Sequence, residues 1–473
     1  MKFSGVRWHS APLGARGAAA NDLTNALDSS YNSLRRKSAR STPVNDDRAE
    51  ASRARDGVSR RDLLWRTAAG VGAGLAALAR PIAAGPTGID PLADQRDHGC
   101  CPTRIAMPAG AGSPSLTDLA TGNKQAMAVA SRSRLAMAAH QAVLDIARGL
   151  PDEPIRRATL DVLANPSSRV HLASPSAADK AAVRQDLLDA GLISDSVPVE
   201  GIFPTIVDVH QAPQAFWSAP GSTYTGHHAY PGGLAVHEWL NARIAKAFVE
   251  GYDAIYHLSS DPKAIDASIA QAAPLWHDIH KVTVFQWRAD SSELVEYPIA
   301  DTGAHHPLSG AEAILRGLPM AFVIALLSAH DAPTTVKSNS TQTGLQRLVN
   351  YIRAAAIVAR RDPVALGLLQ RASDGRFQLS QDPPRIEGHI NHLPDHDYLF
   401  SNDSAATLIG TLRQVAVDYG IDPARQEPRF NLFRNLVFAQ VSDIRLYGVL
   451  QTSGRQGVKV VIGREVDLSQ LSV

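Results

Sequence analysis

The feature that most constrains this chain is an ordered series of histidines, each at the border of an apolar segment with helical spacing. In chain order, the series is His227-His228, His237, His277-Asp278, His305-His306 and His330-Asp331. Imidazole and carboxylate groups are ligands for Zn, Mn and Fe ions, and a His-Asp pair can place two ligands at one helix end. Burying so many imidazoles without partners would cost roughly a few kcal/mol each. A shared metal centre accommodates them most economically.

The same residues have less specific interpretations. A lone histidine on an apolar helix face is more often a hydrogen-bonded core residue than a metal ligand, although four such positions are harder to explain in that way. His227 and His228 either face a substrate beside the ligands or have a structural role. His305 competes with His306 as a ligand, and the proline and glycine that follow favour His306. Asp331 is either a replacement ligand or a loop residue that caps a helix.

Composition excludes several classes of protein. The 473 residues are 44% hydrophobic, which is enough for a sizeable core. Lys and Arg number 47 against 46 Asp and Glu, so the formal net charge is +1. So even a balance of charges indicates neither a protein that coats nucleic acid nor one with a basic patch for a membrane surface. Any charged partner would therefore be recognised locally. The sequence also contains no GxSxG elbow, P-loop or CxxC pair.

Apolar periodicity predicts a mainly α-helical fold. Region 122–200 is expected to be an N-terminal helical layer with helices over 124–150, 153–163 and 177–192. Region 201–365 carries the histidines, and its helices are expected over 234–251, 309–315, 320–329 and 343–361. In region 366–473, segments 437–450 and 458–466 are rich in β-branched residues and flank a Ser-Gly-Arg-Gln-Gly turn. They predict a short hairpin or a small α+β appendage.

The N-terminal part has the features of an export address. Residues 1–58 show no apolar periodicity and read as a disordered or misassigned extension, with Val58 as the expected initiation site. Segment 59–85 begins with Arg60-Arg61, continues with an apolar run and ends with small residues, as in a bacterial Tat signal. We therefore expect the Tat translocase as a partner and a periplasmic or secreted protein. The alternative is a surface helix that happens to carry two arginines.

Segment 86–121 is rich in Pro, Gly, Asp and Ser and is expected to be a linker. It contains the two cysteines of the chain, Cys100 and Cys101, which are adjacent. Neighbouring cysteines cannot join distant parts of a fold, so two exposed thiols are favoured over a vicinal disulfide or an intermolecular bridge.

Taken together, the histidine motifs resemble the HD superfamily of metal-dependent phosphohydrolases. The segment from Trp276 to Lys281, Trp-His-Asp-Ile-His-Lys, matches the His-Asp-x-Gly-Lys motif of that family, with His280 in place of the glycine. The Pro-Gly-Gly-Leu segment that precedes His237 is similar to the corresponding segment of the exoribonuclease-related branch. His306-Pro-x-x-Gly followed by His330 is similar to the cyclic-nucleotide phosphodiesterase branch. The resemblance covers residues 222–362.

The resemblance implies an HD-like helical bundle that holds one or two divalent ions of Mn, Fe, Zn or Mg. The ligands that it implies are His237, His277, Asp278, His306 and His330, with Asp278 bridging two ions. A metal-activated water would then hydrolyse a phosphomonoester or phosphodiester, for example that of a nucleotide, while Lys281 steadies the phosphoryl group. Two alternatives are a di-iron oxygenase of the same superfamily and a degenerate scaffold that binds a ligand or metal without catalysis.

One departure from the family bears on the ligand set. The final ligand of the family is an Asp in an Ala-Asp-x-x-x-Arg helix, and Ala356 stands at that place here. The first metal position is therefore expected to be weak, absent or completed by another residue such as Asp331. A second polar cluster, from Glu387 to Asp397, has spacings that suit a metal, but its Gly, Pro and Asn content predicts a surface loop or a lid.

Overall fold

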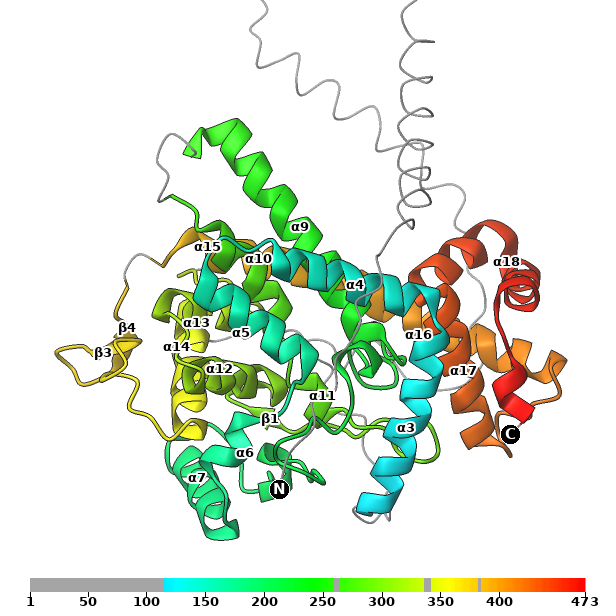
Figure 1. The fold of residues 1–473 in the computed structure, drawn as a ribbon, viewed down its shortest axis with the longest axis horizontal. Helices are drawn as coiled ribbons and strands as arrows, with labels where there is room; N and C mark the ends of the chain where they lie inside the picture. The colour runs from blue at the N-terminus through cyan, green and yellow to red at the C-terminus, as the bar shows by residue number, and fades with distance from the viewer. Residues whose placement is uncertain (1–113, 259–263, 336–341, 382–383, 473) are drawn as a thin grey trace, which may run out of the picture. The chain divides into compact units, whose positions relative to one another are not determined.

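The computed structural model describes residues 114–258, 264–335, 342–381 and 384–472, which all belong to one compact unit. Helices dominate these ranges, and the strands in them form two short antiparallel hairpins (Figure 1). The prediction of a mainly α fold with a small strand component is therefore confirmed. The expected export segment 59–85, Val58 and the two cysteines lie outside the described residues.

The helices fall into an N-terminal group, a central group and a C-terminal group. The N-terminal group is α3 (Leu116–Arg132), α4 (Arg134–Arg148), α5 (Glu153–Ala164), α6 (Arg169–Ala173), α7 (Ala177–Asp189) and α8 (Val199–Ile202). The central group is α9 (Gly233–Tyr256), α10 (Ala267–Trp276), α11 (Lys281–Val284), α12 (His305–Leu315), α13 (Met320–Leu327) and α14 (Gly344–Val358). The C-terminal group is α15 (Ile386–Asp395), α16 (Tyr398–Asp418), α17 (Glu427–Val441) and α18 (Asp443–Glu465).

The two hairpins are small. Strand β1 (Pro298–Ile299) pairs with β2 (Thr302–Gly303), and β3 (Leu369–Arg371) pairs with β4 (Phe377–Leu379), both antiparallel. The first hairpin leads directly into α12, and its turn residues Ala300 and Asp301 both have a positive φ. The second hairpin is the strand component of the C-terminal region.

The N-terminal helices differ from the prediction at one point. The expected helix over 124–150 is two helices, because the Ser133 side chain accepts a 2.9 Å hydrogen bond from the Ala136 backbone N–H and so caps α4. The Ser133 hydroxyl also donates to the Ala439 carbonyl of α17. Helix α3 begins at Leu116, so the last residues of the expected linker are helical.

Region 366–473 contains short strands as predicted, but the prediction that they lie over 437–450 and 458–466 is wrong. Segments 437–450 and 458–466 lie mostly in α17 and α18, and their supposed turn is a kink inside α18 at Gly454, which has φ 60°. Burial explains the difference, because Leu446, Val458 and Ile462 pack into a helical core that overrides the β propensity of branched side chains.

Two large apolar cores hold the described residues together, and a small third cluster of Ala245, Ala270 and Ile390 joins α9, α10 and α15. The larger core includes residues from Ala139 of α4 to Leu379 of β4, so the N-terminal and central helices share it. The second core joins α16, α17 and α18 and also takes in Val129 of α3 and Tyr230. The candidate site therefore lies on elements that both cores fix.

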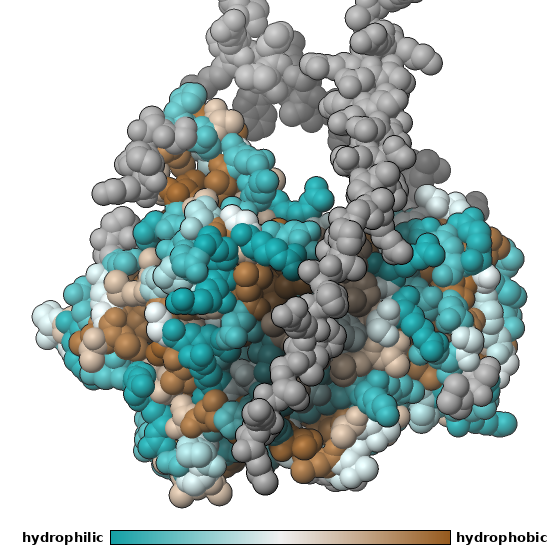
Figure 2. Space-filling view, viewed as in Figure 1, coloured by the Kyte–Doolittle hydropathy of each residue, from teal (hydrophilic) through white to brown (hydrophobic). Residues whose placement is uncertain are grey.

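Helix α9 is the central element for the site. It packs against α4, α10 and α15, and α10 also packs against α13 and α15 (Figure 1). Its far end projects (Figure 1), and Ile255 and Tyr256 are exposed there. Figure 2 shows hydrophilic and apolar side chains mixed over this end of the helix. Among the described residues, none of the helices has the length and apolar character needed to cross a membrane.

Candidate metal centre

The centre is built from the ends of five helices. His237 lies in the second turn of α9, and His277 caps the C-terminus of α10 with Asp278 directly after it. His305 is the first residue of α12, and His330 follows α13. The sixth residue is Asp395, the last residue of α15. All six side chains are buried, with at most 4% of any of these residues exposed.

Local sequence explains why α10 presents two of these residues together. Asp266 caps the N-terminus of α10 through hydrogen bonds from the Ser268 and Ile269 backbone N–H groups. At the other end, the His277 Nδ1–H donates a 2.8 Å hydrogen bond to the Pro274 carbonyl. Because a carbonyl only accepts, this bond leaves the Nε2 lone pair of a neutral His277 free for a cation.

Four side chains surround a first candidate metal position. The His237 Nε2 lies 3.3 Å from Asp278 Oδ2 and 3.2 Å from Asp395 Oδ1. The His277 Nε2 lies 3.4 Å from the same Asp278 oxygen and 3.3 Å from the same Asp395 oxygen. Two imidazoles thus face the same two carboxylate oxygens, which is a suitable donor set for a transition-metal ion.

The other oxygen of Asp278 faces a second candidate position. Its Oδ1 lies 3.1 Å from His305 Nε2, and Asp278, His305 and His330 form a buried group that could hold a cation. The His305 Nδ1–H donates a 2.7 Å hydrogen bond to Glu296, and the His330 Nδ1 shares one of 2.7 Å with the Thr302 hydroxyl. Such bonds to the far nitrogen are how proteins orient ligating imidazoles.

His305 occupies the position that the sequence favoured for His306. The His306 ring instead stacks on His330 with 4.1 Å between centroids and meets Tyr351 edge-on at 5.2 Å. Burial lowers the pKa of His306 to about 3, with the nearby His305 and His277 adding to the effect. His306 belongs to none of the metal-capable groups found among the described residues.

The carboxylate expected near Ala356 comes from a different helix. Ala356 is a buried residue of α14 whose methyl group cannot bind a cation, whereas Asp395 reaches both His237 and His277. Its segment, predicted as a loop, is helix α15, which is fixed by a 2.9 Å hydrogen bond from Asn391 Nδ2 to the Ala325 carbonyl. Tertiary packing thus overrides the Gly, Pro and Asn content. The signal for Asp395 was its place in the second polar cluster.

Asp331 does not replace the missing ligand. Its carboxylate pairs with the Arg347 guanidinium at 3.0 Å and accepts a hydrogen bond from the Tyr351 hydroxyl. Burial raises the pKa of Asp331, while Arg347 and Tyr351 oppose that shift. The N-cap of the following helix α14 is Thr343, so Asp331 does not cap that helix either.

The charges at the centre are strongly coupled. Burial disfavours the charged form of Asp278, yet the neighbouring His277 imidazole and Lys281 ammonium hold its pKa well below the usual range. Burial likewise opposes protonation of His277, but Asp278, Glu238 and Asp395 together raise its pKa to about 10. Several cationic groups are thus held next to these carboxylates.

Two further charged residues adjoin the centre. The Lys281 ammonium is buried and pairs with Asp278 Oδ2, the oxygen that faces the first position. Glu238 follows His237 in α9 and lies 3.7 Å from His277 Nδ1, and burial raises its pKa to about 7. Sequence analysis missed Glu238, although its place beside His237 was visible. His280, the residue in place of the family's glycine, lies 3.6 Å from Glu312, away from these ligands.

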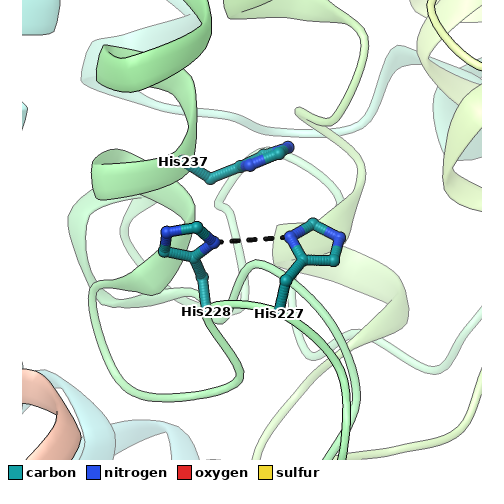
Figure 3. A group of neighbouring side chains, drawn as sticks. All are labelled: His227, His228 and His237. Carbon is teal, nitrogen blue, oxygen red and sulfur yellow. Dashed lines mark hydrogen bonds between the residues drawn. The ribbon is translucent and has the colours of Figure 1, made fainter. Parts of the chain in front are cut away.

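His227 and His228 lie against the other side of His237. The His227 ring centroid is 4.6 Å from that of His237, and the His228 centroid is 5.4 Å from it. Figure 3 shows the His237 ring lying across the gap between the two other rings. The structure therefore brings together every expected ligand except His306. It also places the predicted neighbours His305, His227 and His228 beside them, and it adds Asp395, which was not predicted as a ligand.

Comparison of this chain with protein-family models, with curated proteins and with solved structures gave no match.

Proposed function

We propose that this chain is a metal-dependent hydrolase of phosphate esters with two adjacent divalent cations. The observation that carries the proposal is the environment of Asp278, whose two oxygens face different sets of imidazoles. His237 and His277 lie near Oδ2, and His305 lies near Oδ1. A carboxylate shared in this way could serve two cations, which together would supply an activated water for hydrolysis.

Unsatisfied polar atoms support the fit of cations to this site. The buried Asp278 Oδ1 and His305 Nε2 make no hydrogen bond, and Asp278 Oδ2 has an ion pair with the Lys281 ammonium. Buried groups of this kind are costly unless something satisfies them. The imidazole nitrogens of His237, His277 and His305 lie 3.1–3.4 Å from the Asp278 oxygens without hydrogen-bond geometry, and such nitrogen and oxygen atoms are suited to coordinate a shared cation.

The donor set favours some ions over others. The two positions together offer the imidazoles of His237, His277, His305 and His330 and the carboxylates of Asp278 and Asp395. Imidazole suits Mn, Fe and Zn, whereas Mg prefers oxygen ligands and keeps several waters. We therefore favour Mn, Fe or Zn among the four ions considered.

The protein groups would divide the work of hydrolysis. When bound, paired cations lower the pKa of a shared water toward neutrality and neutralise phosphate oxygens. The Lys281 ammonium, which pairs with Asp278 Oδ2 and donates to the Gly221 carbonyl, would meet a phosphoryl oxygen as a point charge. Burial of all six ligand side chains excludes bulk water and so strengthens each electrostatic interaction in the site.

The experiment uses metal-free protein reloaded with Mn, Fe or Zn and assayed on p-nitrophenyl phosphate and bis(p-nitrophenyl) phosphate. Asp278→Asn should abolish turnover and reduce bound metal, as measured by elemental analysis, because one side-chain oxygen becomes an amide nitrogen. Asp331→Asn is the control, since Asp331 pairs with Arg347 outside the ligand set. Full turnover by Asp278→Asn, or none by the wild type with both positions filled, would contradict the proposal.

A di-iron oxygenase is the second candidate. The observation that favours it is the closed environment of the centre, in which four imidazoles and two carboxylates are almost fully buried. Oxygen uptake by the iron-loaded protein, without phosphatase activity, would identify this function. The degenerate-scaffold alternative rests on Ala356, which stands where the family has a carboxylate ligand. Asp395 offers a carboxylate from another helix, so Ala356 alone does not favour that alternative.

Export remains part of the proposal. A Tat substrate is translocated after folding, which suits a protein that must load its cations inside the cell. Arg60-Arg61→Lys-Lys should retain the protein in the cytoplasm of a bacterial host, because the Tat signal depends on its two arginines. Fractionation of the cells followed by immunoblotting measures the outcome, and export of the variant at the wild-type level would exclude this route.

A further inference from the structure

A buried group of three imidazoles adjoins the candidate centre and contains no carboxylate. His227, His228 and His237 each place one ring nitrogen so that the three atoms lie within 4.8 Å of one another. The Nδ1 atoms of His227 and His228 are 3.4 Å apart, and the rings converge as Figure 3 shows. The three residues are at most 3% exposed. We refer to them as the histidine triad.

The loop that carries His227 and His228 is held by the C-terminal helices. The His227 backbone N–H donates a 2.7 Å hydrogen bond to Asn402 of α16, and the His228 N–H donates one of 3.4 Å to Asp443 of α18. The buried Arg434 guanidinium of α17 donates to the carbonyls of Tyr224 and Ala229 at 2.7 and 3.0 Å. The two imidazoles are therefore fixed in place from three helices.

His228 adopts a backbone conformation that is uncommon for a residue with a side chain. Its φ is +53°, and its carbonyl accepts hydrogen bonds from the N–H groups of Gly221 and Tyr230 at 2.9 and 2.8 Å. A Cβ at Gly233 would lie 1.8 Å from that carbonyl oxygen, and one at Gly221 would lie 2.8 Å from the His228 Cβ. Strained positions of this kind concentrate at functional sites.

The polar atoms of the triad are incompletely satisfied by the protein. The His237 Nδ1 is buried and makes no hydrogen bond, and the bond between His227 and His228 joins two imidazoles. Three buried imidazoles whose ring nitrogens converge, with no carboxylate among them, form a donor set that suits a cation.

We propose that His227, His228 and His237 bind a borderline cation, Zn²⁺ or Cu²⁺, in an all-nitrogen position that overlaps the first position of the centre. Imidazole is a preferred ligand of both ions, and copper binds such donors most tightly among the divalent first-row ions. His237 belongs to both positions. Since one neutral imidazole ring binds one cation, a cation in the histidine triad excludes one from the first position.

This inference does not depend on hydrolysis, so its test measures metal binding alone. Metal-free full-length protein is loaded with one equivalent of Cu²⁺, and electron paramagnetic resonance gives the number of coordinated imidazole nitrogens. The Asp278→Asn variant weakens the first position and leaves the triad complete, so its spectrum should show three. Cu²⁺ in the first position would instead be bound by two imidazoles, those of His237 and His277.

Removing one triad imidazole is the decisive step. His228→Asn, in the Asp278→Asn background, should reduce the nitrogen count to two and weaken Cu²⁺ binding by about tenfold or more, since even outer-shell losses cost that much. Asparagine tolerates the left-handed conformation, so the loop should keep its shape. His227→Gln provides a second test at a residue with ordinary backbone geometry, and circular dichroism verifies the folding of each variant.

The matched control is His140→Gln, which removes a partly buried histidine of α4 that contacts Phe216. It should leave the Cu²⁺ affinity and the nitrogen count unchanged. A count of two that neither His227→Gln nor His228→Asn alters would overturn the proposed site. Simultaneous binding of three ions by the wild type would overturn the overlap of the two positions.

Discussion

At the scale of single residues, the orientation of each side chain decides which histidines can act as ligands. His305 and His306 are neighbours in sequence, yet His305 contacts Asp278 while His306 stacks on His330. Successive residues of a helix point about 100° apart, since 3.6 residues make one turn. Only one of the two could therefore face the shared carboxylate.

Asp395 provides a sharp test of the first position at this scale. Asp395→Asn should weaken metal binding by about 10- to 100-fold, because an amide replaces a charged ligand that faces His237 and His277. Titration calorimetry on metal-free protein gives the affinity. Asp397→Asn, which changes a partly exposed carboxylate two residues away, should have little effect. An unchanged affinity for Asp395→Asn would exclude Asp395 from the ligand set.

The hydrogen bond from His305 to Glu296 gives a second prediction for single residues. Glu296→Gln removes the charge that orients and strengthens this imidazole, so cation affinity at the second position should fall by about 10- to 100-fold. Elemental analysis after dialysis should find fewer ions per chain. The exposed Glu250 of α9 offers a control as Glu250→Gln, and equal losses in both variants would argue against a specific role for Glu296.

At the scale of elements, helix termini bring the ligands together. α10, α12, α13 and α15 all have a candidate ligand at or next to one end, and of these four helices only α10 has a side-chain cap at its N-terminus. Helix α9 begins at Gly233, and His228 lies in the loop that folds back over its first turn. The start of α9 therefore depends on a close backbone approach.

The two glycines of α9 offer a matched pair. Gly233→Ala should destabilise the protein by roughly 1–3 kcal/mol or more, because its Cβ would lie 1.8 Å from the His228 carbonyl oxygen. Gly251→Ala has no neighbouring atom within 4 Å and should be neutral or stabilising by about 0.5–1 kcal/mol. Urea unfolding measures both changes, and equal effects would contradict the close approach at Gly233.

At the scale of the whole molecule, the two apolar cores meet around the centre. α9, α10, α12 and α13 contribute to the larger core, while the loop with His227 and His228 is held by α16, α17 and α18 of the second. Loss of the C-terminal helices should therefore loosen the histidine triad more than the other ligands. Buried histidines also make the stability of the folded chain sensitive to pH.

The metal-free protein should lose stability as the pH falls from 7 to 5. Burial lowers the pKa of His306 to about 3 and of His171 and His392 to about 4, and it holds those of His227, His228 and His330 well below 6.5. Below pH 6.5 the unfolded chain binds protons at these residues that the folded chain does not bind, so the folded state is disfavoured.

Three histidines act in the opposite direction. The pKa values of His237, His277 and His305 are raised because nearby carboxylates outweigh burial, so their contribution is complete below pH 6.5 and is lost as the pH rises through the folded values. The six histidines whose pKa is lowered outnumber these three, so we expect a net loss of stability as the pH falls. Urea unfolding with a chelator at pH 7, 6 and 5 gives the free energies, and constant or rising values toward pH 5 would contradict this prediction.

The sequence by itself determined the helical class and most of the candidate ligands. Apolar periodicity acts over a few residues, so the helix that carries His237 and the later part of α12 followed from local pattern, whereas α10, which ends before His277, was not predicted. The helices at 153–164 and 177–189 were likewise expected close to their observed bounds. The His-Asp pair and its spacing from His237 and His330 identified most of the candidate centre in advance.

Only the tertiary structure decided the remaining ligands and the C-terminal fold. Asp395 lies in a segment whose Gly, Pro and Asn content favours a loop, and packing against α9, α10 and α13 makes it helical. The branched residues of α18 favour strands until burial against α16 and α17 holds them in a helix. In both places, the free energy of burying apolar surface between distant segments exceeds the local preference of the chain, and no short stretch of sequence contains that information.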